Sequence, residues 1–446
     1  MSIISKDRDA KTMAWLEVLF NTYEKGLNGM RTHPISKFKK DAFIALQSER
    51  FPTRKDEDWK YTNVNQILKN SFQQGAAEEI SADDLNEFIF PELDVVRVVF
   101  VNGLINEELS TLQNIPEGAS LLSMKETLAD EEKTAIVERL LSQKSGTDVN
   151  AFLPMNRAFA KNGFFLDIEK NAQIEKSFHF IYINTRGNES HFVHPQLFVN
   201  TNIGSKASII ESYHATDNEA VYFNNTASYI HVAKNANLEH YRLQYESKSA
   251  FQINNTIVTQ ERDSVYSNYA VDLGGKIVRN NLSTELLDSN TETNYYGIYL
   301  GLDNQHIDNQ TFIDHAVPHC QSNELYKGIL SDKARGVFNG KVLVRQDAQK
   351  TNAFQQNSSL VLSNDAIMDA KPQLEIYADD VKCSHGATIG QLDESSIFYL
   401  KSRGLSEIQS RNLLQKAFVG EVVENFKNET IKHSVLNKID QKLDRV

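Results

Sequence analysis

Hydrophobic positions follow a helical period over much of the first 163 residues. Several apolar residues recur at three- and four-residue spacing, as in the series Phe38, Ala42, Phe43 and Leu46. This spacing is typical of the apolar face of a helix. Val95–Val101 instead reads as a strand, with a turn after it. We therefore expect residues 1–163 to form an N-terminal helical region with a few strands.

From about Phe164 to Gly390 the pattern changes to short β-branched and aromatic runs separated by Asn, Asp and Ser. A turn-and-strand unit recurs, for example at Asn171–Ile174, Asn235–Leu238 and Asp263–Tyr266. The spacing, roughly 27 to 35 residues, is typical of a solenoid or propeller. The absence of blade signatures favours a parallel β-helix over residues 164–390. Asparagine tolerates left-handed turns, so we expect corners at the pairs Asn224-Asn225, Asn254-Asn255 and Asn280-Asn281.

After Gly404 the chain is helical again, within a C-terminal helical domain assigned to residues 391–446. Ser406 and Gln409 form a capping box. Apolar residues then recur at four-residue spacing on one helix, namely Leu414, Phe418, Val422 and Phe426. A second helix repeats the stripe with Ile431, Val435, Ile439 and Leu443. Such stripes either pack on their own domain or dock a partner.

Composition narrows the class of protein. The formal net charge is −12, from 47 basic and 59 acidic residues, which argues against general binding to nucleic acid or to an anionic membrane. Two cysteines cannot build a disulfide framework. Met1–Ala10 has no apolar signal region, and no apolar run reaches the length of a membrane span. We expect a soluble cytoplasmic protein.

The chemistry-bearing residues of the chain concentrate in Cys383-Ser384-His385. Residues two apart on a strand face the same way, so Cys383 and His385 share a face. Thiolate and imidazole suit iron, zinc or an iron–sulfur centre. Two ligands cannot hold a metal firmly, so either a partner chain or further residues complete the site, or both residues are structural.

Other histidines carry weaker signals. His315, His319 and Cys320 form a second candidate cluster, but Pro318 interrupts the helix that would make their spacing chelate a metal. This cluster is either part of a structural loop or a set of metal ligands. His191 and His194 fall on opposite faces of an extended segment, which argues against chelation by this pair.

Signatures of common enzymes are absent from the sequence, including phosphate-binding loops, the nucleophile elbow and His-Glu-x-x-His. The pair Asp379-Asp380 leaves one enzymatic alternative, a β-helix carbohydrate-active enzyme. Solvated acids in a turn are the other interpretation of this pair.

Several stretches resemble the SufB/SufD family of iron–sulfur cluster assembly proteins, and its SufD branch in particular. They are Lys371–Thr388, Phe398–Gly404, Phe338-Asn339-Gly340 with Gln349-Lys350-Thr351, and Arg54–Thr62. Family members of the SufB branch carry a sulfur-accepting cysteine before the Cys-Ser-His motif, and the matching stretch here, Phe354–Leu360, has none. Gly386 also stands where that branch has glutamate.

This resemblance implies a mainly β fold, with a right-handed parallel β-helix core between helical regions. It implies a non-enzymatic scaffold that pairs with SufB through the β-helix and docks the SufC ATPase through its C-terminal helices. His385 would then lie at the SufB interface and handle iron or a nascent cluster shared with SufB, with no cofactor stably bound. The isolated chain could form a homodimer through the same face. The remaining alternative is a purely structural interaction protein.

Overall fold

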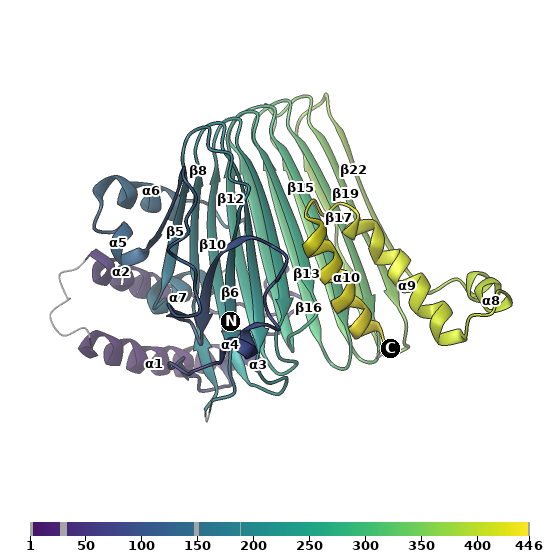
Figure 1. The fold of residues 1–446 in the computed structure, drawn as a ribbon, viewed down its shortest axis with the longest axis horizontal. Coiled ribbons are helices and arrows are strands. Elements are labelled where there is room, and N and C mark those ends of the chain that lie inside the picture. Colours follow the sequence, from purple (N-terminus) through teal and green to yellow (C-terminus); the bar gives the residue numbers. More distant parts are fainter. Residues whose placement is uncertain (1–2, 27–33, 147–150, 188, 445–446) are drawn as a thin grey trace.

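A computed structural model describes residues 3–26, 34–146, 151–187 and 189–444 of the chain. Its centre is a parallel β-solenoid made of two sheets (Figure 1). Successive strands alternate between the sheets, so each strand pairs with the strands of the preceding and following coils. The mainly β fold and the parallel β-helix predicted from the repeat are thereby confirmed.

Sheet A contains β20 (Ile367–Ala370), β18 (Arg335–Val344), β16 (His306–His315), β14 (Ile277–Leu286), β12 (Phe251–Gln260), β10 (Tyr222–Val232), β8 (Gln196–Thr201), β5 (Gly163–Ile168) and β4 (Ala119–Ser123), in that spatial order. Three short strands lie off this path: β21 (Gln373–Ile376) beside β18, β7 (His191–Val193) beside β10, and β1 (Gln73–Gln74) beside β7.

Sheet B contains β22 (Lys382–Gly390), β19 (Asn352–Val361), β17 (Gln321–Leu330), β15 (Glu292–Gly301), β13 (Val265–Asp272), β11 (Asn237–Tyr245), β9 (Lys206–Ala215), β6 (Ser177–Asn184), β2 (Val95–Val101) and β3 (Leu104–Asn106). The strand predicted at Val95–Val101 is therefore present. Because β2 to β4 belong to these sheets, the N-terminal region extends the solenoid as well as flanking it.

The corners of the solenoid depend on residues in the left-handed backbone region. Asn171, Asn235 and Asp263 have φ angles of 61°, 57° and 59°, and all three begin the turn-and-strand units seen in the sequence. The corners expected at the three Asn-Asn pairs are wrong. Asn224-Asn225, for instance, lies within β10, where both residues are buried and Asn225 donates to the Phe152 carbonyl.

The lumen between the sheets holds the largest apolar core, and aromatic side chains from successive coils stack within it. The Tyr182 and Tyr213 rings, for example, lie 4.9 Å apart. Polar groups also enter this lumen. Thr311 of sheet A donates to Glu324 of sheet B across it. Further hydrogen bonds join the two sheets elsewhere along the lumen, as between Asn280 and Asp272, so its interior combines apolar packing with buried polar contacts.

The long helices of the N-terminal region cover the outer face of sheet A, whereas the short α4 (Ala82–Leu85) packs on sheet B. The long ones are α1 (Ile3–Gly26), α2 (Pro34–Ser48), α6 (Glu131–Leu141) and α7 (Phe152–Phe159). Short elements connect them, namely the 3₁₀ turn η1 (Glu57–Trp59), α3 (Asn65–Leu68), α4 and α5 (Met124–Thr127). Apolar side chains of α1, α2 and α7 share one cluster with Phe223, Phe251 and Ile277 of sheet A.

The C-terminal helices are α8 (Glu394–Ser402), α9 (Glu407–Val423) and α10 (Glu429–Leu443). The capping box predicted at Ser406 and Gln409 begins α9. Helices α9 and α10 cover sheet B, and α8 projects away from the solenoid (Figure 1). N-terminal and C-terminal helices therefore flank the solenoid, as predicted. The exact domain boundaries at residues 163 and 390 stay a prediction. In the part of the chain described, no helix is long and apolar enough to cross a membrane.

Candidate functional site

Strand β22 ends sheet B and carries the Cys383-Ser384-His385 motif. It pairs with β19 on one side, and among the described residues no strand pairs with its other side. Eight of its nine residues are exposed, all except the half-buried Cys383. An unpaired edge offers a row of backbone donors and acceptors to another strand. The motif therefore lies on an exposed strand whose backbone groups on one side are unpaired within the described residues.

Register decides which way the motif points. Cys383 pairs with Ala353 and His385 pairs with Gln355. Ala353 and Gln355 are buried, whereas Phe354 between them is exposed, so the odd-numbered residues of β19 face the lumen. Cβ atoms of paired residues point to the same face. Cys383 and His385 consequently share the lumen-side face, as predicted, at the open end of the solenoid.

Cys383 and His385 differ in their surroundings. The Cys383 side chain packs beside a small apolar cluster that includes Val342 and Ala353. Burial there raises the pKa of the Cys383 thiol above its ordinary value. A protonated thiol is a poor metal ligand. His385 is exposed on its strand, so its imidazole is the more accessible of the two side chains.

A buried carboxylate lies behind His385. Tyr295, Glu324, Gln355 and His385 are successive register partners and form one row on the lumen face. Glu324 is 3 % exposed, and burial raises its pKa to about 7. Its carboxylate accepts hydrogen bonds from Thr311 at 2.7 Å and from Gln355 at 3.2 Å. Sequence reasoning missed this row because its members lie one coil apart.

A groove of about 510 Å³ lies alongside the same edge. Its lining includes Phe354, Ser384 and His385 from the two last strands, and Glu421 from α9. The Glu421 carboxylate pairs with the Lys327 ammonium group of β17. Phe354, at 46 % exposed, is the most accessible large apolar side chain in the lining of this groove. The edge strand and the groove form one continuous surface.

The second candidate cluster does not assemble. His315 is buried in β16, where burial lowers its pKa to about 4 and its ring nitrogen contacts the Ser322 hydroxyl at 2.9 Å. His319 occupies a left-handed corner with a φ of 65°. Cys320 is fully buried, with its thiol 3.6 Å from the Asp288 carbonyl oxygen. The described residues contain no group of three or more His, Cys, Asp or Glu side chains placed to hold a metal ion. These contacts favour the structural interpretation.

The stripe proposed for docking lies mostly against the chain's own β-helix. Val422 and Phe426 are 0 % and 2 % exposed and belong to the apolar cluster on sheet B. Leu414 and Phe418 are partly buried, and the Lys327 ammonium group lies 4.5 Å from the Phe418 ring centre. Placing Val422 and Phe426 on a docking surface is therefore wrong, because a four-residue stripe is the same whether it meets its own domain or a partner.

Another apolar surface remains open on the C-terminal helices. Phe398 and Tyr399 of α8 are 75 % and 56 % exposed, and Ile408 and Leu413 of α9 are 72 % and 46 % exposed. We call these four residues the α8–α9 patch. Exposed apolar side chains commonly mark an interaction site where they form a patch. The sequence prediction placed docking elsewhere, and the Phe-Tyr pair inside the Phe398–Gly404 motif is the sequence signal that could have indicated this surface.

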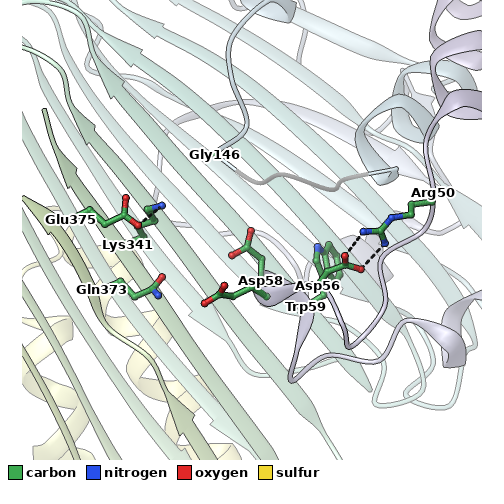
Figure 2. Close-up of a pocket in the computed structure, with 9 residues that line it drawn as sticks. Arg50, Asp56, Asp58, Trp59, Gly146, Lys341, Gln373 and Glu375 are labelled. Carbon is green, nitrogen blue, oxygen red and sulfur yellow. Dashed lines mark hydrogen bonds and ion pairs between the residues drawn. The ribbon is translucent and has the colours of Figure 1, made fainter. Parts of the chain in front are cut away.

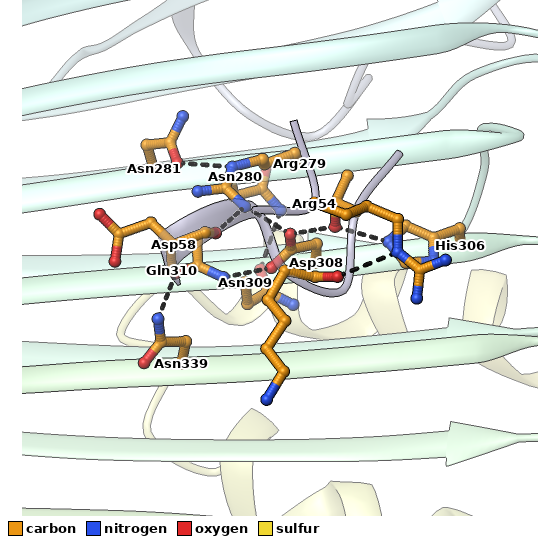
Figure 3. A network of polar contacts seen from close by, with 12 residues as sticks. Arg54, Asp58, Arg279, Asn280, Asn281, His306, Asp308, Asn309, Gln310 and Asn339 are labelled. Carbon is orange, nitrogen blue, oxygen red and sulfur yellow. Dashed lines mark hydrogen bonds and ion pairs between the residues drawn. The ribbon is translucent and has the colours of Figure 1, made fainter. Parts of the chain in front are cut away.

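The N-terminal motif Arg54–Thr62 fastens the helical region to sheet A (Figure 3). The Arg279 guanidinium lies 3.6 Å from the Trp59 ring centre and donates to the Asp58 carbonyl oxygen at 2.7 Å. Asp308 accepts from Arg279 at 2.6 Å and also from the Thr62 hydroxyl. Arg279 and Asp308 are buried, so this motif has a structural role in the chain.

A polar groove of about 380 Å³ separates that motif from the last coil of sheet A (Figure 2). The Lys341 ammonium group pairs with Glu375 at 2.8 Å on one side of it. On the other side, Arg50 donates to Asp56 at 2.7 Å, and this bond lowers the pKa of the Asp56 carboxyl group to about 2. These charges are matched within the chain, which gives the groove no evident ligand.

Comparison with known proteins places the chain in a family. The model of the SufBD core domain, described as SUF system FeS cluster assembly, matches residues 182–418, and the model of the SufBD N-terminal region matches residues 11–180. The chain is 34% identical to an iron–sulfur cluster assembly SufBD family protein of Synechocystis over 85% of this chain and 84% of that protein.

Two further relatives agree. The iron–sulfur cluster assembly protein SufD of Escherichia coli is 32% identical over 88% of this chain and 89% of its own length. Protein ABCI7, chloroplastic, of Arabidopsis thaliana is 30% identical over 91% of this chain and 86% of its own. The chain therefore belongs to the SufBD family of iron–sulfur cluster assembly proteins, with SufD among its relatives.

Proposed function

We propose that this chain is a scaffold subunit of an iron–sulfur cluster assembly complex, and that it pairs with a SufB-type paralogue along the free edge of β22. The observation that carries the proposal is the exposed, unpaired strand that presents His385 at the open end of the solenoid. The proposal requires that the paralogous β-helix ends in the same kind of strand. Edge pairing would therefore continue sheet B across the interface.

His385 supplies one ligand to the iron or nascent cluster that the two subunits share. An imidazole suits iron, and a single exposed ligand from this chain leaves the remaining positions to the partner. Partial coordination by each subunit also suits a scaffold that releases its product. Cys383 is a weaker candidate, because its thiol packs beside an apolar cluster and has a raised pKa. The cluster is cargo in this scheme, and the chain keeps no resident cofactor.

The α8–α9 patch is the docking surface for the SufC-type ATPase of the complex. It lies on helices that also contact sheet B, since α9 continues into the buried Val419, Val422 and Val423. Movement of the ATPase would thus reach the β-helix through one continuous helix. The chain itself acts without enzymatic turnover, and ATP hydrolysis belongs to the partner. The cytoplasm is the proposed compartment.

The decisive experiment replaces His385 with alanine in the assembled three-subunit complex. Cluster formation, followed by the visible absorbance of the iron–sulfur chromophore, should fall about tenfold or more, since even losing a group that only orients a ligand commonly costs about 10- to 100-fold. His433→Ala is the matched control, because His433 is also exposed but lies on α10. A complex that forms clusters at the normal rate with His385→Ala contradicts the proposal.

A further inference from the structure

The side-chain amide of Gln355 occupies the position between Glu324 and His385 in the lumen row. Its nitrogen donates to Glu324 Oε2 at 3.2 Å. Its oxygen is buried and, among the described residues, accepts no hydrogen bond. A buried acceptor without a donor is unfavourable, so an unpaired oxygen beside a functional residue requires an explanation.

The surroundings fix which way this amide faces. Glu324 Oε2 also accepts from the Thr311 hydroxyl at 2.7 Å, which holds the carboxylate in place. Gly340 of β18 lies on the other side of the lumen, where a Cβ atom would come within 2.2 Å of Gln355 Nε2. Since the amide nitrogen is directed at β17, we infer that the amide oxygen is directed to the opposite side, toward β22. That is the strand that carries His385.

His385 is the register partner of Gln355 on that strand. Paired residues of neighbouring strands are about 5 Å apart, within reach of two long side chains. In the described part of the chain the His385 ring makes no hydrogen bond, and its exposure leaves it free to turn. A turn that brings one ring N–H to the Gln355 oxygen satisfies both groups. Histidines that bind metals commonly donate their second nitrogen to such an acceptor.

We propose that Gln355 is a positioning residue for His385. Its amide oxygen accepts the proton-bearing nitrogen of the imidazole, which selects one tautomer and directs the other nitrogen outward from the open end of the solenoid. Glu324 acts indirectly: it accepts a hydrogen bond from the amide nitrogen of Gln355 and so keeps that amide from flipping. The hydrogen bond itself is a property of this chain alone, and only its use in binding iron rests on the proposed function.

The test measures the tautomer of His385 by ¹⁵N NMR of the full-length chain labelled at histidine, at a mildly alkaline pH. His385→Ala identifies the signal. The unsubstituted chain should show one dominant tautomer, and Gln355→Met, which removes the acceptor at similar length, should show a mixture of two. Gln355→Leu repeats the test if the methionine variant does not fold.

Gln356→Met is the matched control. Gln356 is the next residue of β19, is exposed, and faces away from the lumen, so this variant should keep one tautomer. Glu324→Gln should increase the population of the second His385 tautomer less than Gln355→Met does. The Gln355 amide is still present in this variant, although it can then flip. An unchanged tautomer in Gln355→Met, as expected if water alone satisfies the amide oxygen, overturns the proposal. Normal cluster formation in His385→Ala would instead contradict only the proposed function.

Discussion

Arg279 shows how a single buried charge can hold two parts of this protein together. It lies between the Trp59 ring and the Asp308 carboxylate, and both partners of the ion pair are at most 1 % exposed. Neither charge can recover its hydration in that position. Removing one partner therefore leaves the other charge buried and uncompensated.

Asp308→Ala should accordingly lower the free energy of unfolding by about 3–5 kcal/mol. Chemical denaturation followed by circular dichroism measures it. Asp380→Ala is the control, since its ion pair with Lys350 is exposed and worth about 1 kcal/mol at most. Equal losses of unfolding free energy in the two variants would show that the buried Arg279–Asp308 pair matters no more for stability than the exposed pair.

Glu324 gives the protein a second residue-scale property, a dependence of stability on pH. Burial raises its pKa from the ordinary value of 4.5 to about 7. Between these two pH values the folded state keeps the proton on Glu324, whereas the unfolded state has released it. Stability from this group is present at low pH and is lost as pH rises through 7. Between pH 5 and 7 the loss is about 2 kcal/mol.

Glu324→Gln should remove that loss. Denaturation midpoints at pH 5 and pH 7 for both proteins measure it, and the difference between them isolates this group from all others. On going from pH 5 to pH 7, the free energy of unfolding of the variant should rise by about 2 kcal/mol relative to that of the unsubstituted chain. Parallel pH dependence in the two proteins would contradict the raised pKa.

At the scale of elements, the C-terminal helices divide into a buried part and an exposed part. Phe426 is 2 % exposed and contacts the Tyr269 ring at 5.0 Å, whereas Phe398 is 75 % exposed. The same Phe→Ala substitution at these two positions therefore distinguishes a residue that packs on the solenoid from one that is free to contact a partner.

Phe426→Ala should cost about 3–5 kcal/mol of stability, because it leaves a cavity against sheet B. Phe398→Ala should change stability by no more than about 0.5 kcal/mol. We expect Phe398→Ala to weaken binding of the SufC-type ATPase, measured by titration calorimetry. Normal ATPase binding by Phe398→Ala would argue against the α8–α9 patch as the docking surface.

Strand β22 is the other element with a testable role. The Lys382 N–H bonds to Thr351 on the β19 side, and alternate residues of a parallel strand direct their backbone groups to opposite sides. Ala387 therefore directs its N–H to the free edge, while Thr388 directs its own to β19.

Ala387→Pro should abolish co-purification with the SufB-type partner and leave the thermal unfolding midpoint nearly unchanged. Thr388→Pro should lower that midpoint, because proline there removes a bond of the ladder. Retention of the partner by a folded Ala387→Pro chain would mean that the edge of β22 is not the interface.

Comparing the elements with the sequence shows where local patterns suffice. The capping box at Ser406 and the left-handed corners at Asn171, Asn235 and Asp263 depend on neighbouring residues only. The Asn-Asn pairs do not form corners, because an asparagine amide can hydrogen-bond within a turn or to a neighbouring coil, and the sequence does not distinguish the two. Only the burial of Asn224 and Asn225 inside β10 separates the two.

For the whole molecule, buried neutral histidines determine the response to acid. Burial lowers the pKa of His179 and His194 to about 3, and that of His191, His231, His306 and His315 to about 4. The unfolded chain takes up protons on these groups below about 6.5, so stability is lost as pH falls from there. Glu324 and Glu246, each with a pKa raised to about 7, act in the opposite direction but are fewer.

His194→Phe should reduce this acid sensitivity. His194 packs against aromatic rings, with Phe192 4.8 Å away, so phenylalanine fits the site without a titrating group. Between pH 7 and pH 5 the variant should lose about 2 kcal/mol less than the unsubstituted chain. Denaturation at the two pH values measures this, and equal losses would show that His194 does not titrate as described.

The sequence by itself determined the order of the three regions, the parallel β-helix and the family, since all three depend on local alternation, on repeat length or on contiguous motifs. It also determined that Cys383 and His385 share a face, because that follows from strand geometry alone. Tertiary structure decided the rest. Pairing between coils placed Glu324 and Gln355 behind His385, and packing on sheet B buried Val422 and Phe426. Such contacts join residues a whole coil or more apart, so no periodicity along the chain specifies them.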